Sequence, residues 1–474
     1  MDFSGIASEK YLKDSMKWMA DQNLSGKGRK EFKYLWRSYK EDRKHGWSQF
    51  IAKPGRTWIY DNAVGIYALL KFSKLAKIRE EKEESEKHYK SAGKAIESLI
   101  KLNQWEERRG FKGLWHFSYD THGSYISPMG PMGANLFVLN AIYAYIIQGG
   151  DRTYLKWIND RVKTFIFDQQ VMDKDDPRYG LIQAGLRLDK GNRNSQMTWC
   201  NIEHNTEYAG TLRLAARANQ GRDKEFLLEL AERHELLVKG ILKNFWQGDH
   251  FCTLITETGE INQLVSADTT SWTPFVLMPY MDMNDVWKCI QYIKDNFRIE
   301  VEEGERCYHW HWKQLPGSGR KIVLKNKKVP FQKKVAGLFF FTREHGENIP
   351  PEEIEKLEKM LHPEAMAYMG LLLMEFAKHT EDKEKRKEAL DFLRELYEGI
   401  VTMKEAYGGK GTPYATLNVE DYSNTLESMT SAASGAIFTM ALMGVDIDDF
   451  LGVVPPESFS VDGKKPFNRQ TEQK

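Results

Sequence analysis

Residues 133–169 read GANLFVLNAIYAYIIQGGDRTYLKWINDRVKTFIFDQ. The first part, residues 134–147, is small and apolar on every side, whereas the second part places charged and apolar residues at helical spacing. The chain turns between them within residues 149–151, and so short a link makes the two helices antiparallel neighbours. The stretch predicts a helical hairpin whose first helix is covered all round and whose second helix faces solvent.

This alternation recurs along the chain. Twelve segments have helical periodicity, at about residues 7–20, 58–79, 85–103, 133–149, 151–169, 203–220, 222–246, 268–281, 284–297, 352–379, 383–404 and 427–443. Short turns alternate with connections of twenty residues or more. Loops that long are unusual in compact domains and tend to be functional. Six helical hairpins that close into a ring, with every long loop on one rim, would produce this pattern.

We therefore predict an all-α protein, an (α/α)6 toroid. One domain spans residues 1–461, and residues 462–474 form a polar C-terminal tail. Strand signals are weak and limited to residues 250–256, which precede a turn, and to 321–324 with 329–331. They predict one or two small β-hairpins that decorate the ring.

Composition restricts the classes of partner. With 68 basic and 67 acidic residues among 474, the chain has no net field to attract nucleic acid or an anionic membrane. No apolar run approaches the ~20 residues that span a bilayer. Residues 1–5 do not resemble a secretory signal, so we expect a cytoplasmic protein. Four scattered cysteines lack the spacing of metal ligands, and no metal or cofactor is expected.

Each long loop ends in a polar cluster that opens the next helix. The ring would bring these clusters to one funnel, which would collect Asp61, Asn135, Glu203, Asp268, Glu364 and Glu427. Asp and Asn are also favoured helix caps, and an acid in a first turn gains about 0.3–1 kcal/mol from the helix dipole. Each residue alone therefore also has a purely structural interpretation.

The densest cluster is Trp199-Cys200-Asn201-Ile202-Glu203-His204-Asn205-Thr206-Glu207. Glu203 and Glu207 are four residues apart and share one helix face. Repulsion between them can keep one carboxyl protonated near neutral pH, as a general acid requires. Because the helix dipole favours the anion, a protonated acid also needs partial burial. The structural alternative is that Glu203 caps the helix while Glu207 faces solvent or an arginine.

Three further acids are candidates for an ionised partner. Asp61 follows Trp58-Ile59-Tyr60 at a helix start, where a carboxylate stays ionised and suits a general base. Asp268, which opens Asp268-Thr269-Thr270-Ser271-Trp272, is an alternative base. Glu427 is the third, and it begins the predicted helix 427–443, which would complete the ring.

Two loop segments are rich in aromatic residues. Residues 114–120 contain Trp115 and Asp120, and the segment His309-Trp310-His311-Trp312 contains paired tryptophans. We interpret the tryptophans as exposed stacking surfaces for sugar rings. Metal binding by His309 and His311 is the alternative, but no third ligand stands at a telling spacing.

Residues 173–176, Asp-Lys-Asp-Asp, match the DxDD string of the proton donor in class II terpene cyclases. That chemistry needs an acid buried in an apolar cavity. Here the string follows a predicted helix and precedes Pro177, so we interpret it as a turn.

Four segments resemble the six-hairpin glycosidase-like superfamily: Trp58–Leu70, Gly130–Asn135, Glu203–Glu207, and Glu427 before a small-residue helix. The resemblance implies an acid/base pair in the funnel that acts on a carbohydrate. Two departures are that position 62 is Asn and that Glu427 lacks a neighbouring Gly-Thr. The residues then expected to bind the sugar are Trp58, Asn62, Trp115, Asp120, Asn135, Trp199, His204, Asn205, Trp272, Trp310 and Trp312.

The resulting prediction is an enzyme that cleaves or remodels a glycosidic bond. Glu203 is the expected general acid, Glu207 tunes it, and Asp61 or Asp268 is the base or nucleophile. Retention or inversion would depend on a carboxylate separation of about 5–5.5 Å or 6.5–9.5 Å.

Two alternatives remain open. A polysaccharide lyase or sugar epimerase on the same ring would use tyrosine or histidine as proton-transfer groups, with His204, His309 and His311 available. In a non-catalytic saccharide-binding protein, the acids would be caps and only the aromatic residues would bind.

Overall fold

The computed structural model describes residues 32–36, 57–109, 113–120, 122–125, 127–189, 193–262, 265–302, 306–308, 328–330, 334–338, 361–406 and 412. Several predicted features lie outside these residues. They are helices 7–20 and 427–443, strand 321–324, tail 462–474, Glu427 and the His309–Trp312 segment.

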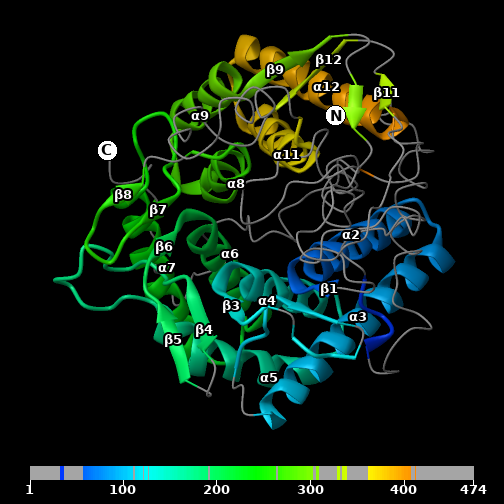
Figure 1. The fold of residues 1–474 in the computed structure, drawn as a ribbon. Helices are drawn as coiled ribbons and strands as arrows, with labels where there is room; N and C mark the ends of the chain where they lie inside the picture. The colour runs from blue at the N-terminus through cyan, green and yellow to red at the C-terminus, as the bar shows by residue number, and fades with distance from the viewer. Residues whose placement is uncertain are drawn as a thin grey trace, which may run out of the picture.

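An inner layer of helices forms an arc around the centre of the molecule (Figure 1). Its described members are α2 (Ile59–Ile78), α4 (Met132–Ile147), α6 (Ile202–Ala218), α8 (Ala267–Leu277) and α11 (Pro363–His379). Each packs against the next in this order. In α4, 14 of 16 residues are buried, because neighbours cover the helix on both sides. The apolar stretch 134–147 thus forms the inner helix that its composition predicts.

An outer layer covers the inner one (Figure 1). Its described helices are α3 (Lys82–Arg108), α5 (Thr153–Arg161), α7 (Lys224–Asn244), α9 (Met283–Phe297) and α12 (Lys383–Ala406). In α5 just two of nine residues are buried, as expected for a helix with one face in solvent. The chain continues from α5 through a π-helical turn, Val162–Ile166, and a 3-10 turn, Phe167–Gln169.

Each outer helix packs on the inner helix that precedes it. The described residues therefore contain five consecutive hairpins of an (α/α)6 toroid, and the predicted fold class is confirmed. None of the described helices is long and apolar enough to cross a membrane.

The long loops contain more strands than the sequence predicts. The antiparallel pairings are β1 (Thr57–Trp58) with β2 (Ser118–Tyr119); β3 (Met129–Pro131) with β4 (Gly185–Asp189) and β5 (Arg193–Met197); β6 (Cys200–Asn201) with β7 (Leu254–Ile255) and β8 (Ile261–Asn262); β9 (Arg298–Val301) with β12 (Val335–Leu338); and β10 (Arg306–Tyr308) with β11 (Lys328–Pro330). The β7–β8 hairpin confirms the strand predicted within residues 250–256. Strands β1, β3 and β6 run directly into α2, α4 and α6, so the loops hold the starts of these helices.

Residues 173–176 lie in turns, as predicted. Asp176 accepts a hydrogen bond of 2.6 Å from the Arg178 guanidinium, and this pairing lowers the pKa of the carboxyl. An ionised, ion-paired aspartate in a turn is not the buried proton donor of a cyclase.

Candidate active site

The inner helices place equivalent residues at one depth. The second residues of the described helices are Tyr60, Gly133, Glu203, Asp268 and Glu364. The residues four positions later are Val64, Phe137, Glu207, Trp272 and Tyr368. Residues i and i+4 lie one above the other on a helix face. The first set therefore forms an upper layer and the second a lower layer; we call the two layers together the funnel.

The lower layer is a buried floor. The rings of Phe137 and Trp272 lie 6.3 Å apart, and those of Trp272 and Tyr368 lie 5.0 Å apart. Trp272 Nε1 donates a hydrogen bond to Glu207, and Asn140 Nδ2 donates to Glu207 Oε2 over 3.0 Å. These contacts join α4, α6, α8 and α11 beneath the upper acids and exclude water from that level.

Tyr60 connects α2 to α11. Its hydroxyl donates to Glu364 Oε1 over 2.5 Å and lies 2.6 Å from the hydroxyl of Tyr368. Burial and the nearby Glu364 carboxyl raise the pKa of both phenols well above the usual value. Both tyrosines therefore stay protonated, and Tyr60 stabilises a negative charge on Glu364.

Glu203 has the properties that a general acid needs. Burial raises the pKa of its carboxyl to about 8, and the charges of Asp268 and Glu364 add to the shift. The residue is nevertheless only partly buried. The cap of α6 is Asn201, whose Oδ1 accepts from Glu203 N over 2.7 Å. The Glu203 carboxyl is thus not used for capping, which removes the structural alternative for it.

Glu207 lies below Glu203 with an exposed fraction of 2%. The expectation that it could face solvent is therefore wrong. Burial raises the pKa of this carboxyl to about 8, although the hydrogen bond from Trp272 opposes the shift. The charge of Glu203 raises the pKa further, so the two acids are electrostatically coupled.

Asp268 completes the upper layer from α8. Burial raises the pKa of its carboxyl, while hydrogen bonds involving Ser266 and the backbone N–H of Thr269 oppose that shift. Asp61 stands one residue beyond Tyr60 in α2 and is 4% exposed, so it lies outside the register of the upper layer.

His204 fills a gap in the upper layer. Gly133 has no side chain there, and a Cβ on it would lie 2.4 Å from His204 Cδ2. Burial lowers the pKa of the imidazole to about 4, so the ring is neutral. Its Nδ1 is buried without a hydrogen-bond partner among the described residues. The Trp199 ring lies 5.8 Å away.

Three predicted sugar ligands occupy the same position in three inner helices, where they bind backbone groups of the loops. Asn62, Asn135 and Asn205 are each the fourth residue of an inner helix and are fully buried. Each Oδ1 accepts from the backbone N–H of a loop residue over 2.8 Å. Each Nδ2 donates to the carbonyl four residues earlier. These hydrogen bonds favour a structural role for the three asparagines, which tie the loops to the inner helices.

Two other candidates stabilise their own loop. Trp115 is 1% exposed, and its Nε1 donates to Leu99 O over 2.8 Å, so the expectation of an exposed stacking surface is wrong. Asp120 Oδ1 accepts from the backbone N–H groups of His122 and Ser124, as in a turn. Trp58 packs on the ring of Phe117 at 4.7 Å.

Four residues that complete the funnel have no chemical role predicted from the sequence: Tyr60, Phe137, Glu364 and Tyr368. Glu364 appears in the predicted rim set, but its bond to Tyr60 spans 304 positions. The sequence does contain a signal for these residues, in their positions counted from the start of each inner helix. Counting from each helix start, the second residue is acidic or aromatic in four of the five described inner helices, and so is the sixth; both are in α6, α8 and α11.

Solved structures share this fold over nearly the whole chain. A D-mannose isomerase matches with a TM-score of 0.58 at 12% identity, covering 93% of this chain and 96% of its own. A sugar epimerase from a ruminal bacterium matches with a TM-score of 0.57 at 11% identity, covering 94% and 100%. A family 76 glycoside hydrolase (mannosidase) from Bacteroides thetaiotaomicron matches with a TM-score of 0.53 at 11% identity, covering 91% and 96%. No protein-family model and no curated protein matches the sequence. The predicted likeness to six-hairpin glycosidase-like proteins is confirmed at the level of fold.

Proposed function

We propose that the protein is a carbohydrate-active enzyme, a glycoside hydrolase whose general acid is Glu203. The observation that carries the proposal is the pKa of about 8 for a carboxyl that remains accessible at the mouth of the funnel. Such a group is protonated at neutral pH and can deliver its proton to a leaving oxygen. The sugar enzymes among the solved structures of the same fold support this class of substrate.

The partner of Glu203 must be an ionised carboxylate. Glu364 fits this role because the Tyr60 hydroxyl donates to it and stabilises its charge. Asp268, the predicted base, faces the same centre from α8 and remains a second candidate. In hydrolysis, Glu203 protonates the glycosidic oxygen as the bond from that oxygen to the anomeric carbon breaks. The partner either activates water or attacks the anomeric carbon itself.

The charge of the funnel favours an uncharged or cationic saccharide. The charges that affect the pKa of Glu203 among the described residues come from Asp268 and Glu364, both acidic. A uronate or sugar phosphate would add a like charge to this site. Trp272 and Tyr368, which are 3% and 5% exposed, close the bottom of the funnel beneath the upper acids.

A sugar epimerase or isomerase is the second candidate. His204 favours it, because a neutral imidazole in the upper layer can accept a proton from a carbon next to a carbonyl. Epimerisation moves that proton off and back to the opposite face and leaves the glycosidic bond intact.

The deciding experiment screens neutral, amino and uronic oligosaccharides with the purified protein while NMR follows the products. Hydrolysis predicts new reducing ends, whereas epimerisation predicts a changed sugar without cleavage. Glu203→Gln should strongly slow cleavage of natural saccharides while binding persists. Glu375→Gln, another buried carboxyl on an inner helix, is the matched control and should keep activity. Normal cleavage by a folded Glu203→Gln protein would refute the assignment.

A further inference from the structure

Trp199 lies at the rim of the funnel, three residues before α6 begins. Strand β6 leads from Trp199 directly into α6, whose second residue is Glu203, the proposed general acid. The Trp199 ring lies 5.8 Å from the ring of His204, and the two ring planes are tilted by 32°. The His204 ring in turn lies against the start of α4, because a Cβ on Gly133 would lie 2.4 Å from it. Trp199 is therefore next to the junction of α4 and α6, on the loop side of the upper layer.

The backbone of Trp199 is fixed on both sides. Ala184 N donates to Trp199 O over 2.9 Å, and the Arg178 guanidinium donates to Thr198 O. The next residue, Cys200, is fully buried. The indole takes part in none of these bonds, has no hydrogen bond to another described residue, and belongs to a partly exposed residue. The loop thus holds Trp199 in place while part of its surface is free to contact a ligand.

The other described tryptophans that the sequence predicts as sugar ligands are less available. Trp115 and Trp272 are 1% and 3% exposed. Trp58 packs on the ring of Phe117, and its Nε1 is inaccessible to solvent. Trp199 is the described member of this set that combines partial exposure with a position beside the proposed general acid.

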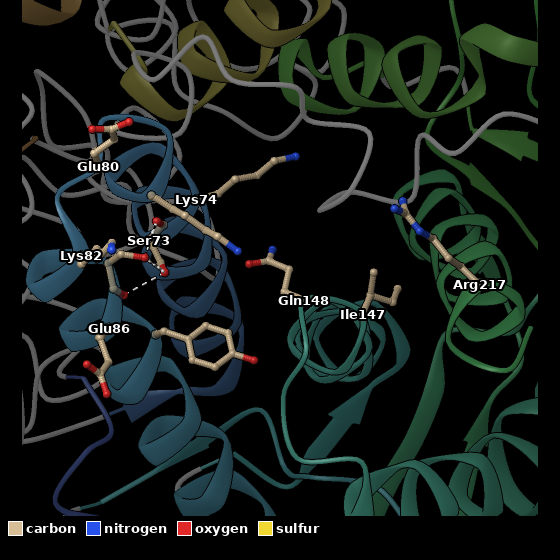
Figure 2. Close-up of a pocket in the computed structure, with 11 residues that line it drawn as sticks. Ser73, Lys74, Glu80, Lys82, Glu86, Ile147, Gln148 and Arg217 are labelled. Atoms are coloured by element: carbon tan, nitrogen blue, oxygen red, sulfur yellow. Dashed lines mark hydrogen bonds between the residues drawn. The ribbon is translucent and has the colours of Figure 1, made fainter.

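The opposite end of the inner helices has a different lining. A hollow of about 1120 Å³ lies there, lined by the last turns of α2, α4 and α6 and the first turns of α3 (Figure 2). Charged and polar side chains such as Lys77 and Glu80 make up most of its lining. The aromatic residue among the described lining residues is Tyr89, whose ring is stacked on Tyr145 at 5.0 Å. Among the described residues, an aromatic platform for a sugar ring is therefore found at the funnel rather than at this end.

We infer that Trp199 binds the leaving sugar of an oligosaccharide by stacking against it, an inference that rests on the proposed hydrolysis. A general acid protonates the oxygen of the leaving group, so the leaving sugar must lie beside Glu203. Trp199 is four residues before Glu203 and occupies that side of the site. An indole ring stacks on apolar ring faces, and a neutral pyranose with mostly equatorial hydroxyls exposes such a face of C–H groups. The substrate class is therefore a neutral oligosaccharide of at least two rings.

Kinetics with and without a leaving sugar test this inference. Cellobiose and mannobiose carry a sugar as the leaving group, whereas glucosyl and mannosyl fluorides lose fluoride and place no ring on Trp199. Trp199→Ala should lower kcat/KM for the disaccharides about fivefold to tenfold, and should change it by less than about twofold for the fluorides. Trp199→Phe should restore most of the loss, because a smaller aromatic ring can still stack. An equal loss for both kinds of substrate, or no loss for either, would overturn the inference.

Calorimetric titration with the same disaccharides separates this inference from the proposed function, because binding needs no cleavage. In the Glu203→Gln background, Trp199→Ala should weaken disaccharide binding by about fivefold or more. Trp246→Ala is the matched control and should leave binding unchanged. Trp246 is also partly exposed and packs on an aromatic ring, that of Phe251 at 5.0 Å, but it lies beyond the end of the outer helix α7.

The outcomes of the titration are distinct. Weakened binding in Trp199→Ala, without cleavage of any saccharide by the wild-type protein, would refute the hydrolase and keep Trp199 as a sugar-binding residue. Unchanged affinity in a folded Trp199→Ala protein, an equal loss in Trp246→Ala, or no saturable binding of either disaccharide would overturn the inference.

Discussion

The Tyr60 hydroxyl donates a hydrogen bond of 2.5 Å to Glu364 Oε1 and thereby joins the first turns of α2 and α11. The Tyr60 hydroxyl oxygen also lies 2.6 Å from the hydroxyl of Tyr368, which is one turn below Glu364 on α11. Since Tyr60 has a single proton, it donates to the carboxylate and accepts from Tyr368. Tyr368, Tyr60 and Glu364 thus form a short chain of hydrogen bonds, which stabilises a negative charge on the Glu364 carboxylate in the funnel.

Tyr60→Phe should reduce kcat/KM by about 10- to 100-fold, because a hydrogen bond to a charged group is worth about 1.5–3 kcal/mol. Removing the donor destabilises the Glu364 anion. The acid limb of the pH–rate profile should therefore move to higher pH. Tyr368→Phe, which acts through Tyr60, should shift the limb less. An unmoved acid limb in Tyr60→Phe would argue against Glu364 as the ionised partner.

The basic limb of the wild-type profile should fall near pH 8. Glu203 donates a proton only below its pKa, so activity should fall as the pH rises through that value. Glu203→Gln should lower kcat by about 10²–10⁴. Saccharides with a good leaving group, such as nitrophenyl glycosides, need little protonation and should recover much of the rate. Equal losses for poor and good leaving groups would contradict general-acid catalysis.

Asp268→Asn tests the electrostatic origin of that limb. The charge of Asp268 raises the pKa of Glu203, so its removal should move the basic limb of the pH–rate profile to lower pH. If Asp268 is also the base, the acid limb should disappear as well. Asp249→Asn, at an exposed aspartate, should leave both limbs in place. A basic limb that stays fixed in Asp268→Asn would show that Asp268 does not act on Glu203.

The fold could be predicted because its signal is periodic and repeated. The apolar stretch 134–147 beside the charged 151–169 indicates an inner and an outer helix, and the alternation of loop lengths orders the pairs. The position of Glu203 at a helix start, one turn before Glu207, was predictable too. Each of these signals is local in the sequence.

The rest of the funnel depends on the helix register to a single residue. Gly133 faces the funnel, whereas Asn135, two residues later and about 200° around the helix, anchors a loop. Both belong to the same polar cluster, and caps and ligands share residue types. The role proposed for Glu364 depends on its hydrogen bond with Tyr60, which lies 304 positions earlier in the sequence. Such a contact has no local signal.

Asn135→Ala should destabilise the fold by about 2–5 kcal/mol in urea unfolding. The change leaves the backbone N–H and carbonyl of Trp115 without partners, and each buried unsatisfied group costs about 1–3 kcal/mol. Asn284→Ala, at an outer helix start, should stay within about 0.5 kcal/mol. Full stability of Asn135→Ala, together with weakened saccharide binding, would instead restore Asn135 as a sugar ligand.

Gly133→Ala should destabilise the protein by about 1–3 kcal/mol, because the new methyl group would overlap the His204 ring. In a His204→Ala background the same change should be neutral or slightly stabilising, since space is available and alanine favours helices over glycine. The two substitutions therefore form a double-mutant cycle whose coupling measures the contact. Unfolding in urea gives all four free energies. An equal cost of Gly133→Ala in both backgrounds would mean that the glycine is needed for another reason, and that His204 does not occupy its place in the funnel.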